Sequence, residues 1–73
     1  IKYTLPKKSK VNLSIYNLTG QRVQTIVQKS QKAGIYTQQW NASKLASGVY
    51  FYLIKIKNSA GIKTETRKML LVK

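Results

Sequence analysis

The amino-acid sequence predicts an all-β fold, either a sandwich or a barrel of antiparallel strands. Apolar and polar residues alternate along most of the chain, which is the period of a strand with one buried face. Turn signals built from Gly, Asn, Ser and Lys separate the alternating segments at short intervals. No segment of useful length shows the helical period. Several short strands with such spacing are typical of β-sandwiches and β-barrels.

The first half of the chain alternates clearly and then loses its period. Residues 1–5 place apolar side chains at the odd positions, and Pro6 ends this segment. Residues 11–15 repeat the pattern, and Gly20 after them can supply the positive φ that a short hairpin requires. Residues 22–27 then break strict alternation, which predicts a bulge or a bend at that point.

A short word, Gly followed by a β-branched residue and Tyr, occurs at residues 34–36 and again at residues 48–50. Each glycine ends a loop where the backbone must bend, and the next two residues suit the pleated, half-buried surface of a strand. The first of these strands is expected to place Tyr36, Gln38 and Trp40 on one face. We therefore interpret the word as the start of a strand and not as a solenoid repeat.

The two predicted strands are joined by a loop over residues 41–48, which is expected to include one tight helical turn that tucks Leu45 under the sheet. The longest strand follows Gly48. Inward positions of this strand and of the earlier ones form the predicted core: Tyr3, Leu13, Ile15, Trp40, Tyr50, Tyr52 and Ile54.

Two apolar segments break the alternation. Phe51 and Leu53 lie on what should be the solvated face of the longest strand, and residues 69–72 are apolar on both faces. Exposed apolar strands are hazards that proteins normally suppress. Either neighbouring loops cover these residues or the residues are offered to a partner, and the pattern leaves both options open.

The composition argues against an enzyme. The 73 residues suit one small domain, residues 1–73, and they include no Cys and no His. Glu65 is the only acidic residue, so neither a catalytic triad nor a carboxylate pair can form, and metal sites lack ligands. We therefore predict a single non-catalytic domain without a cofactor. Because the chain opens with Ile1 and not with Met, directly in an alternating segment, we expect it to be a piece of a longer polypeptide.

The charge is strongly basic. Fourteen Lys and Arg residues against one acidic residue give a formal net charge of +13 at pH 7. Nucleic acid is the first partner that such a charge suggests, but the basic residues form no block and no basic helix. The pattern favours solvated strand faces and charged turns, so we expect no specific nucleic-acid binding. Attraction to polyanions should be weak and salt-sensitive, and it should fall gradually as lysines are neutralised.

Four segments, taken in order, resemble a known family: IKYTLP, VNLSIYNLTGQRV, QKAGIYTQQWNASKLASGVYFYLIK and the terminal KMLLVK. Together they cover nearly the whole chain and resemble the type A C-terminal sorting domain of cargo proteins of the type IX secretion system. The resemblance implies an immunoglobulin-like antiparallel β-sandwich of about seven strands. The glycines and aromatic residues of its structural motif are Gly34, Tyr36, Trp40, Gly48, Tyr50 and Tyr52.

The resemblance also implies a function. The domain would direct a cargo on its N-terminal side from the periplasm, across the outer membrane of a Gram-negative bacterium, to the cell surface. Its partners would be the outer-membrane translocon or shuttle, a surface sortase that commonly removes the domain, and, through weak binding, anionic lipopolysaccharide. Recognition would fall on the last residues: Lys68, Met69, Leu70, Leu71, Val72 and Lys73.

Two other interpretations stay open beside this one. A non-catalytic accessory module of a secreted enzyme predicts further domain sequence after Lys73. A module that binds an anionic polymer predicts that the lysines converge on one face, with exposed aromatic residues between them. The inward positions of Tyr36, Trp40, Tyr50 and Tyr52 favour a core role for the aromatic residues instead.

Overall fold

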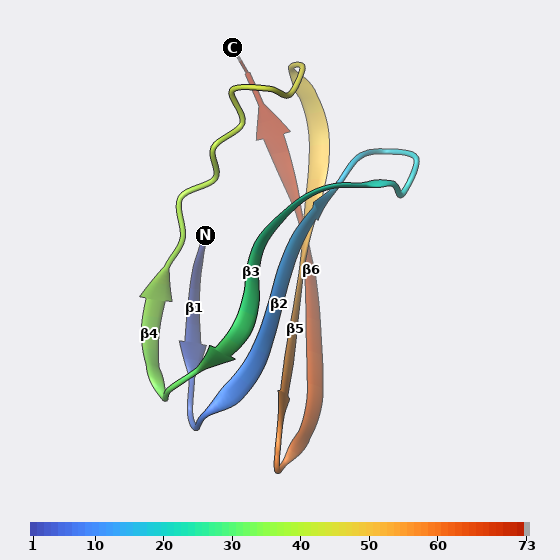
Figure 1. Cartoon of the computed structure of the whole chain (residues 1–73). Helices are drawn as coiled ribbons and strands as arrows, with labels where there is room; N and C mark the ends of the chain where they lie inside the picture. Colours follow the sequence, from blue (N-terminus) through green and yellow to red (C-terminus); the bar gives the residue numbers. More distant parts are fainter. Residues whose placement is uncertain (73) are drawn as a thin grey trace.

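The chain forms two antiparallel sheets in the computed structural model, which describes residues 1–72 (Figure 1). The strands are β1 (Lys2–Leu5), β2 (Ser9–Tyr16), β3 (Arg22–Gln31), β4 (Gly34–Thr37), β5 (Gly48–Asn58) and β6 (Gly61–Leu71). The larger sheet has the order β3-β2-β5-β6, and β1 pairs with β4 in the smaller sheet. Residues 1–72 contain no helix, and therefore none that could cross a membrane. The all-β prediction is confirmed.

The number of strands is lower than expected. Residues 1–72 form six strands and not about seven. Strand β4 ends at Thr37, because the residues after it do not alternate, and residues 38–47 run as a loop. The spacing of Trp40 from Tyr36 predicted a position on a strand. That prediction is wrong, because Trp40 lies in this loop. Within the loop, the Leu45 N–H donates a hydrogen bond to the Ala42 carbonyl (3.0 Å), which forms the tight turn expected there.

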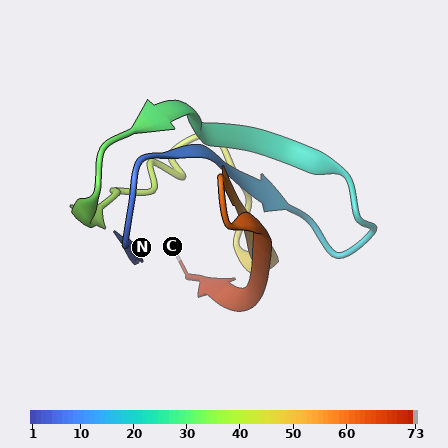
Figure 2. The same ribbon diagram turned by 90° about the horizontal axis from the view of Figure 1, so that it is seen from below.

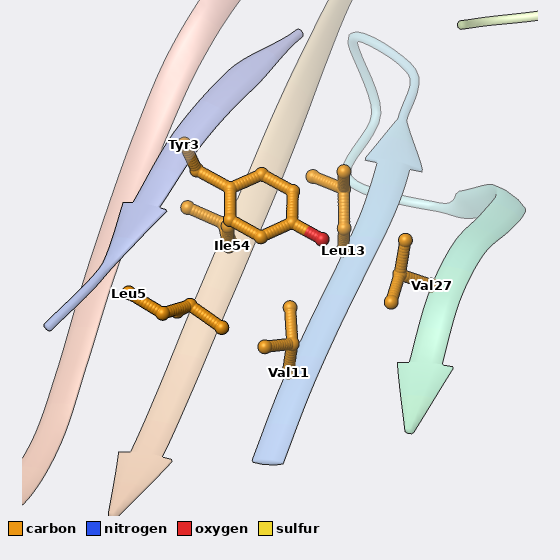
Figure 3. Close-up of a cluster of buried hydrophobic side chains, with 6 residues drawn as sticks. All are labelled: Tyr3, Leu5, Val11, Leu13, Val27 and Ile54. Carbon is orange, nitrogen blue, oxygen red and sulfur yellow. The ribbon is translucent and has the colours of Figure 1, made fainter. Parts of the chain in front are cut away.

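The core lies between the two sheets and draws on four of the strands. Its central cluster consists of Tyr3, Leu5, Val11, Leu13, Val27 and Ile54 (Figure 3). The predicted core residues that are buried are Tyr3, Leu13, Ile15, Tyr50 and Ile54. Trp40 and Tyr52 are only half-buried, the first because it lies in the loop. Tight burial is thus concentrated on the inner face of the larger sheet and on β1.

Strand β3 contains the irregularity that its broken alternation predicted. Leu13 of β2 pairs with Val27, but the next residue, Ser14, pairs with Thr25, so Ile26 is an extra residue on β3. A second register shift follows two residues further along β2. Bulges of this kind bend a strand and increase its twist, and Figure 1 shows the resulting bend in β3.

Both copies of the Gly-x-Tyr word begin a strand. Strand β4 starts at Gly34 with φ of 153°, and β5 starts at Gly48 with φ of 156°. Residues with a side chain rarely adopt this conformation. A Cβ atom at Gly48 would meet no other atom within 4 Å, so the requirement for glycine there is conformational and not steric.

The tyrosine of each copy ties its strand to the loop before it. The Tyr36 hydroxyl donates a hydrogen bond to the Lys32 carbonyl (2.6 Å), and the Tyr50 hydroxyl donates one to the Ala46 carbonyl (2.7 Å). In both copies the acceptor lies four residues before the tyrosine, so the bond spans the glycine. The repeated word is therefore one structural device used twice, similar to the tyrosine corner of β-sandwiches.

Candidate functional site at the C-terminal edge strand

Strand β6 lies at the edge of the larger sheet. It pairs with β5 over its whole length, from Gly61 opposite Asn58 to Leu71 opposite Gly48. Within residues 1–72 no strand pairs with its other side. An edge strand presents a row of unpaired backbone N–H and C=O groups, which is a template for pairing with another chain.

The apolar residues at the end of β6 divide between two faces. Met69 lies opposite the buried Tyr50 and is half-buried, as is Leu71. Leu70 and Val72 point the other way and are 70% and 77% exposed. The prediction that this segment is apolar on both faces is confirmed. The face with Met69 and Leu71 is partly covered, and the face with Leu70 and Val72 is exposed.

The remaining predicted recognition residues flank this segment. Lys68 lies opposite Phe51 on β5 and is exposed. Lys73 lies outside the described residues.

The outer face of the larger sheet, which is turned away from the smaller sheet, has an apolar end made of Val49, Phe51, Leu53 and Leu70. The β2–β3 loop flanks this apolar end, and Leu18 of that loop is 70% exposed. Phe51 and Leu53 are half-buried. The loop therefore covers these two residues in part, and a contiguous apolar surface stays accessible beside β6.

A cleft of about 490 Å³ is lined by residues of β1, β5 and β6. Figure 2, seen along the strands, shows that the larger sheet curves and that the N-terminal segment with β1 lies on its concave side. Tyr52 lines this cleft, together with charged residues of β6. Arg67 Nε donates a hydrogen bond to Glu65 Oε1 (2.7 Å), and this bond and the carboxylate charge raise the pKa of Arg67 above its ordinary value. Glu65 lies opposite Ile54, so these charges are on the inner face. Inward charges on an edge strand discourage indiscriminate pairing.

Comparison with known protein families identifies the family of the chain. The model of one family, described as the secretion system C-terminal sorting domain, matches residues 1–72. The chain belongs to this family. No curated protein and no solved structure matches the chain. As a sorting domain, the chain is a C-terminal secretion signal of the type IX system, interacts with that machinery, and is secreted to the cell surface or the extracellular space of Gram-negative bacteria.

Most aromatic residues of the sorting domain's motif pack against other aromatic rings. The Trp40 and Tyr50 rings meet edge to face with their centroids 5.6 Å apart, and the Tyr3 and Tyr36 rings stack at 5.4 Å. Trp40 Nε1 also donates a hydrogen bond to Gln24 Oε1 (3.0 Å). Such ring pairs stabilise a fold beyond the area that they bury. The Tyr36 contact therefore stabilises the smaller sheet, and the Trp40 contacts fix the loop after β4 against β3 and β5.

The basic residues of the sorting domain are not evenly spread in space. Lys8, Lys10, Lys55 and Lys57 come together at the opposite end of the outer face, which we call the basic end. They lie on a solvated strand face and in the connection between β1 and β2, as the sequence pattern indicated, and pairing of the strands brings them close together. The sequence pattern could not reveal the cluster, because Lys10 and Lys57 become neighbours only through the β2–β5 pairing. Alternation alone, by contrast, places Glu65 and Arg67 on one face.

Proposed function

We propose that the chain is a single domain of residues 1–73 that serves as the address of a secreted cargo attached on its N-terminal side. Strand β6 carries this address. The observation that supports the assignment most strongly is the free edge of β6 combined with the exposure of Leu70 and Val72 on that strand's end. Membership of the sorting-domain family supports the role of a signal and not of a catalyst.

Addition of a receptor strand to β6 is the mechanism that this geometry favours. The unpaired N–H and C=O groups of the edge supply the hydrogen bonds, and alternate side chains fill pockets of the receptor. Leu70 and Val72 make the apolar contact, each contributing about 1.5–3 kcal/mol when fully buried. Met69 and Leu71 hold the strand against the domain, while Lys68 and Lys73 set its register.

The proposed route has three steps and three partners. The outer-membrane translocon or its shuttle reads β6 in the periplasm and passes the cargo to the cell surface. A surface sortase then removes the domain, and the cargo is linked to anionic lipopolysaccharide. The domain contributes recognition at the first step and is released at the second.

A cargo fusion produced in a host with type IX machinery tests this assignment. The double change Leu70→Asp/Val72→Asp places two charges on the exposed side of β6 without disturbing buried residues. The cargo should stay in the periplasm, as scored by surface protease access and cell fractionation. Ile62→Asp is the matched control, because Ile62 lies on the same strand, is 58% exposed and is far from the C-terminal end. This control should reach the surface.

Deletion of residues 68–73 is the more drastic form of the same test and should also retain the cargo. The thermal unfolding midpoints of both point variants should match that of the parent domain. Normal surface delivery of the Leu70→Asp/Val72→Asp fusion and of the deletion would contradict the assignment of β6. The domain would then act as a passive accessory module.

A further inference from the structure

Two lysines face each other across strands β2 and β5. Lys10 lies directly opposite Lys57, and Asn12 lies opposite Lys55. Residues two apart on a strand share a face, so all four lie on the outer face of the larger sheet. The three lysines are exposed. Like charges directly opposite one another destabilise a sheet, so this arrangement has a cost for folding.

No carboxylate among residues 1–72 relieves this repulsion. Glu65 is the only acidic residue of the chain, and it lies on the inner face opposite Ile54. There it accepts the hydrogen bond from Arg67. The positive charges of the basic end are therefore available to an external anion. Arrangements that lower the stability of a fold, such as opposed like charges, are expected at functional sites, where a bound ligand can offset the loss.

Two hollows in the surface adjoin the opposed lysines. Their volumes are about 390 and 200 Å³, and Lys10 and Lys57 line both. The remaining lining residues are Lys8, Ser9, Ser30 and Asn58 in the larger hollow, and Val11, Asn12, Gln28 and Lys55 in the smaller. The Ser14 hydroxyl donates to Asn12 Oδ1 (2.8 Å), so the Asn12 N–H₂ group is the part of that amide that can serve a ligand.

We propose that the basic end binds a glycan that carries two or more phosphate groups. A phosphate in each hollow would lie between lysine ammonium groups, and charge-assisted hydrogen bonds would replace their mutual repulsion. The amide and hydroxyl side chains of the lining can pair with sugar hydroxyls. Nucleic acid fits less well, because neither hollow has an aromatic residue on which a base could stack.

This proposal does not rest on the role of β6 as the address. On the β5–β6 pair, Lys57 lies opposite Ile62, near one end, whereas Leu70 lies opposite Val49, near the other. A variant at the basic end therefore leaves the proposed recognition strand unchanged. Failure of either proposal can be recognised without reference to the other.

Titration of the isotope-labelled domain with pyrophosphate, followed by amide NMR at about 0.15 M salt, tests the site. The shifts should concentrate at the basic end. The variant Lys10→Gln/Lys57→Gln should weaken binding by about tenfold or more, since it removes both shared cations. The control Arg22→Gln/Lys44→Gln lowers the net charge equally at exposed positions outside both hollows. It should change the affinity by less than about twofold, as screened distant charges do.

Two further probes identify the ligand class. A bisphosphorylated glucosamine disaccharide should bind at least as tightly as pyrophosphate and lose affinity in the Lys10→Gln/Lys57→Gln variant alone. A mixed-sequence single-stranded oligodeoxynucleotide should lose affinity equally in both double variants. Equal losses of pyrophosphate binding in both variants would show only diffuse attraction and overturn the proposal. Tighter, site-dependent binding of the oligonucleotide than of the disaccharide would overturn the choice of a glycan.

Discussion

The two ends of the outer face differ in chemistry although one strand runs through both. Strand β5 places Val49, Phe51 and Leu53 at the apolar end and then Lys55 and Lys57 at the basic end, all on the same face. Pairing with β6 covers the whole of β5, and pairing with β2 runs from Lys57 to Phe51, so both ends belong to one continuous sheet. The difference therefore reflects side chains that folding leaves free to vary.

The inner face of the same strands shows the opposite behaviour. Leu13 is 0% exposed and Ile54 is 3% exposed, and both belong to the central cluster under the smaller sheet. Close packing leaves little choice of side chain there. The contrast teaches that function in this small two-sheet domain is to be sought on the outer face and on the edge of β6, where the fold does not dictate the residues.

The largest expected effect comes from a cavity in the buried core, because the core supports both ends of the outer face. Leu13→Ala should lower the free energy of unfolding by about 2–5 kcal/mol, because it leaves a cavity in a fully buried position. The measurement is the midpoint of denaturant unfolding, followed by tryptophan fluorescence. Both ends should lose their binding together at temperatures where the variant unfolds.

Trp40→Ala is the comparison for that experiment. Trp40 is half-buried in a loop and loses mainly one edge-to-face contact and one hydrogen bond, so it should cost less than Leu13→Ala. Circular dichroism replaces fluorescence for this variant. An unchanged midpoint in Leu13→Ala, or a greater loss in Trp40→Ala, would show that the core has been assigned wrongly.

A smaller effect, of the opposite sign, is expected at the basic end. Lys57→Gln removes one of two directly opposed charges and should raise the free energy of unfolding by about 0.2–1 kcal/mol. The gain should be visible as a higher thermal midpoint at low salt and should shrink as salt screens the repulsion. Lys29→Gln is the control, since Lys29 lies opposite Val11 and not opposite a cation. The same gain in both variants would remove the argument that the opposed pair is costly.

Much of the fold could be predicted from local pattern. Alternation located the strands, and the broken period of residues 22–27 located the bulges on β3. The Gly-x-Tyr word located the starts of β4 and β5, because positive φ and a strand-forming tyrosine are local requirements. The position of Trp40 was missed, since its spacing from Tyr36 fits a strand although the residues around it do not alternate.

The sites were less predictable because they depend on pairing between distant strands. The apolar segment at residues 69–72 was visible as a break in alternation, and the structure adds that β6 has a free edge. At the basic end, alternation places Lys55 and Lys57 on one face of β5, but no local pattern brings Lys10 beside them. Lys10 and Lys57 are far apart in the sequence, and only the register of β2 against β5 makes them neighbours. The polymer-binding hypothesis predicted lysines that converge on one face with exposed aromatic residues between them; four lysines adjoin at the basic end, and no aromatic residue lines its two hollows.

The central claim is that the two ends serve different partners and that sorting resides at the apolar end of β6. The most direct measurement is the fraction of a cargo fusion that reaches the cell surface, compared between Leu70→Asp/Val72→Asp and Lys10→Gln/Lys57→Gln in one host. We predict that the first fusion stays in the periplasm and that the second is delivered like the parent. Delivery of the first fusion together with retention of the second would contradict the claim.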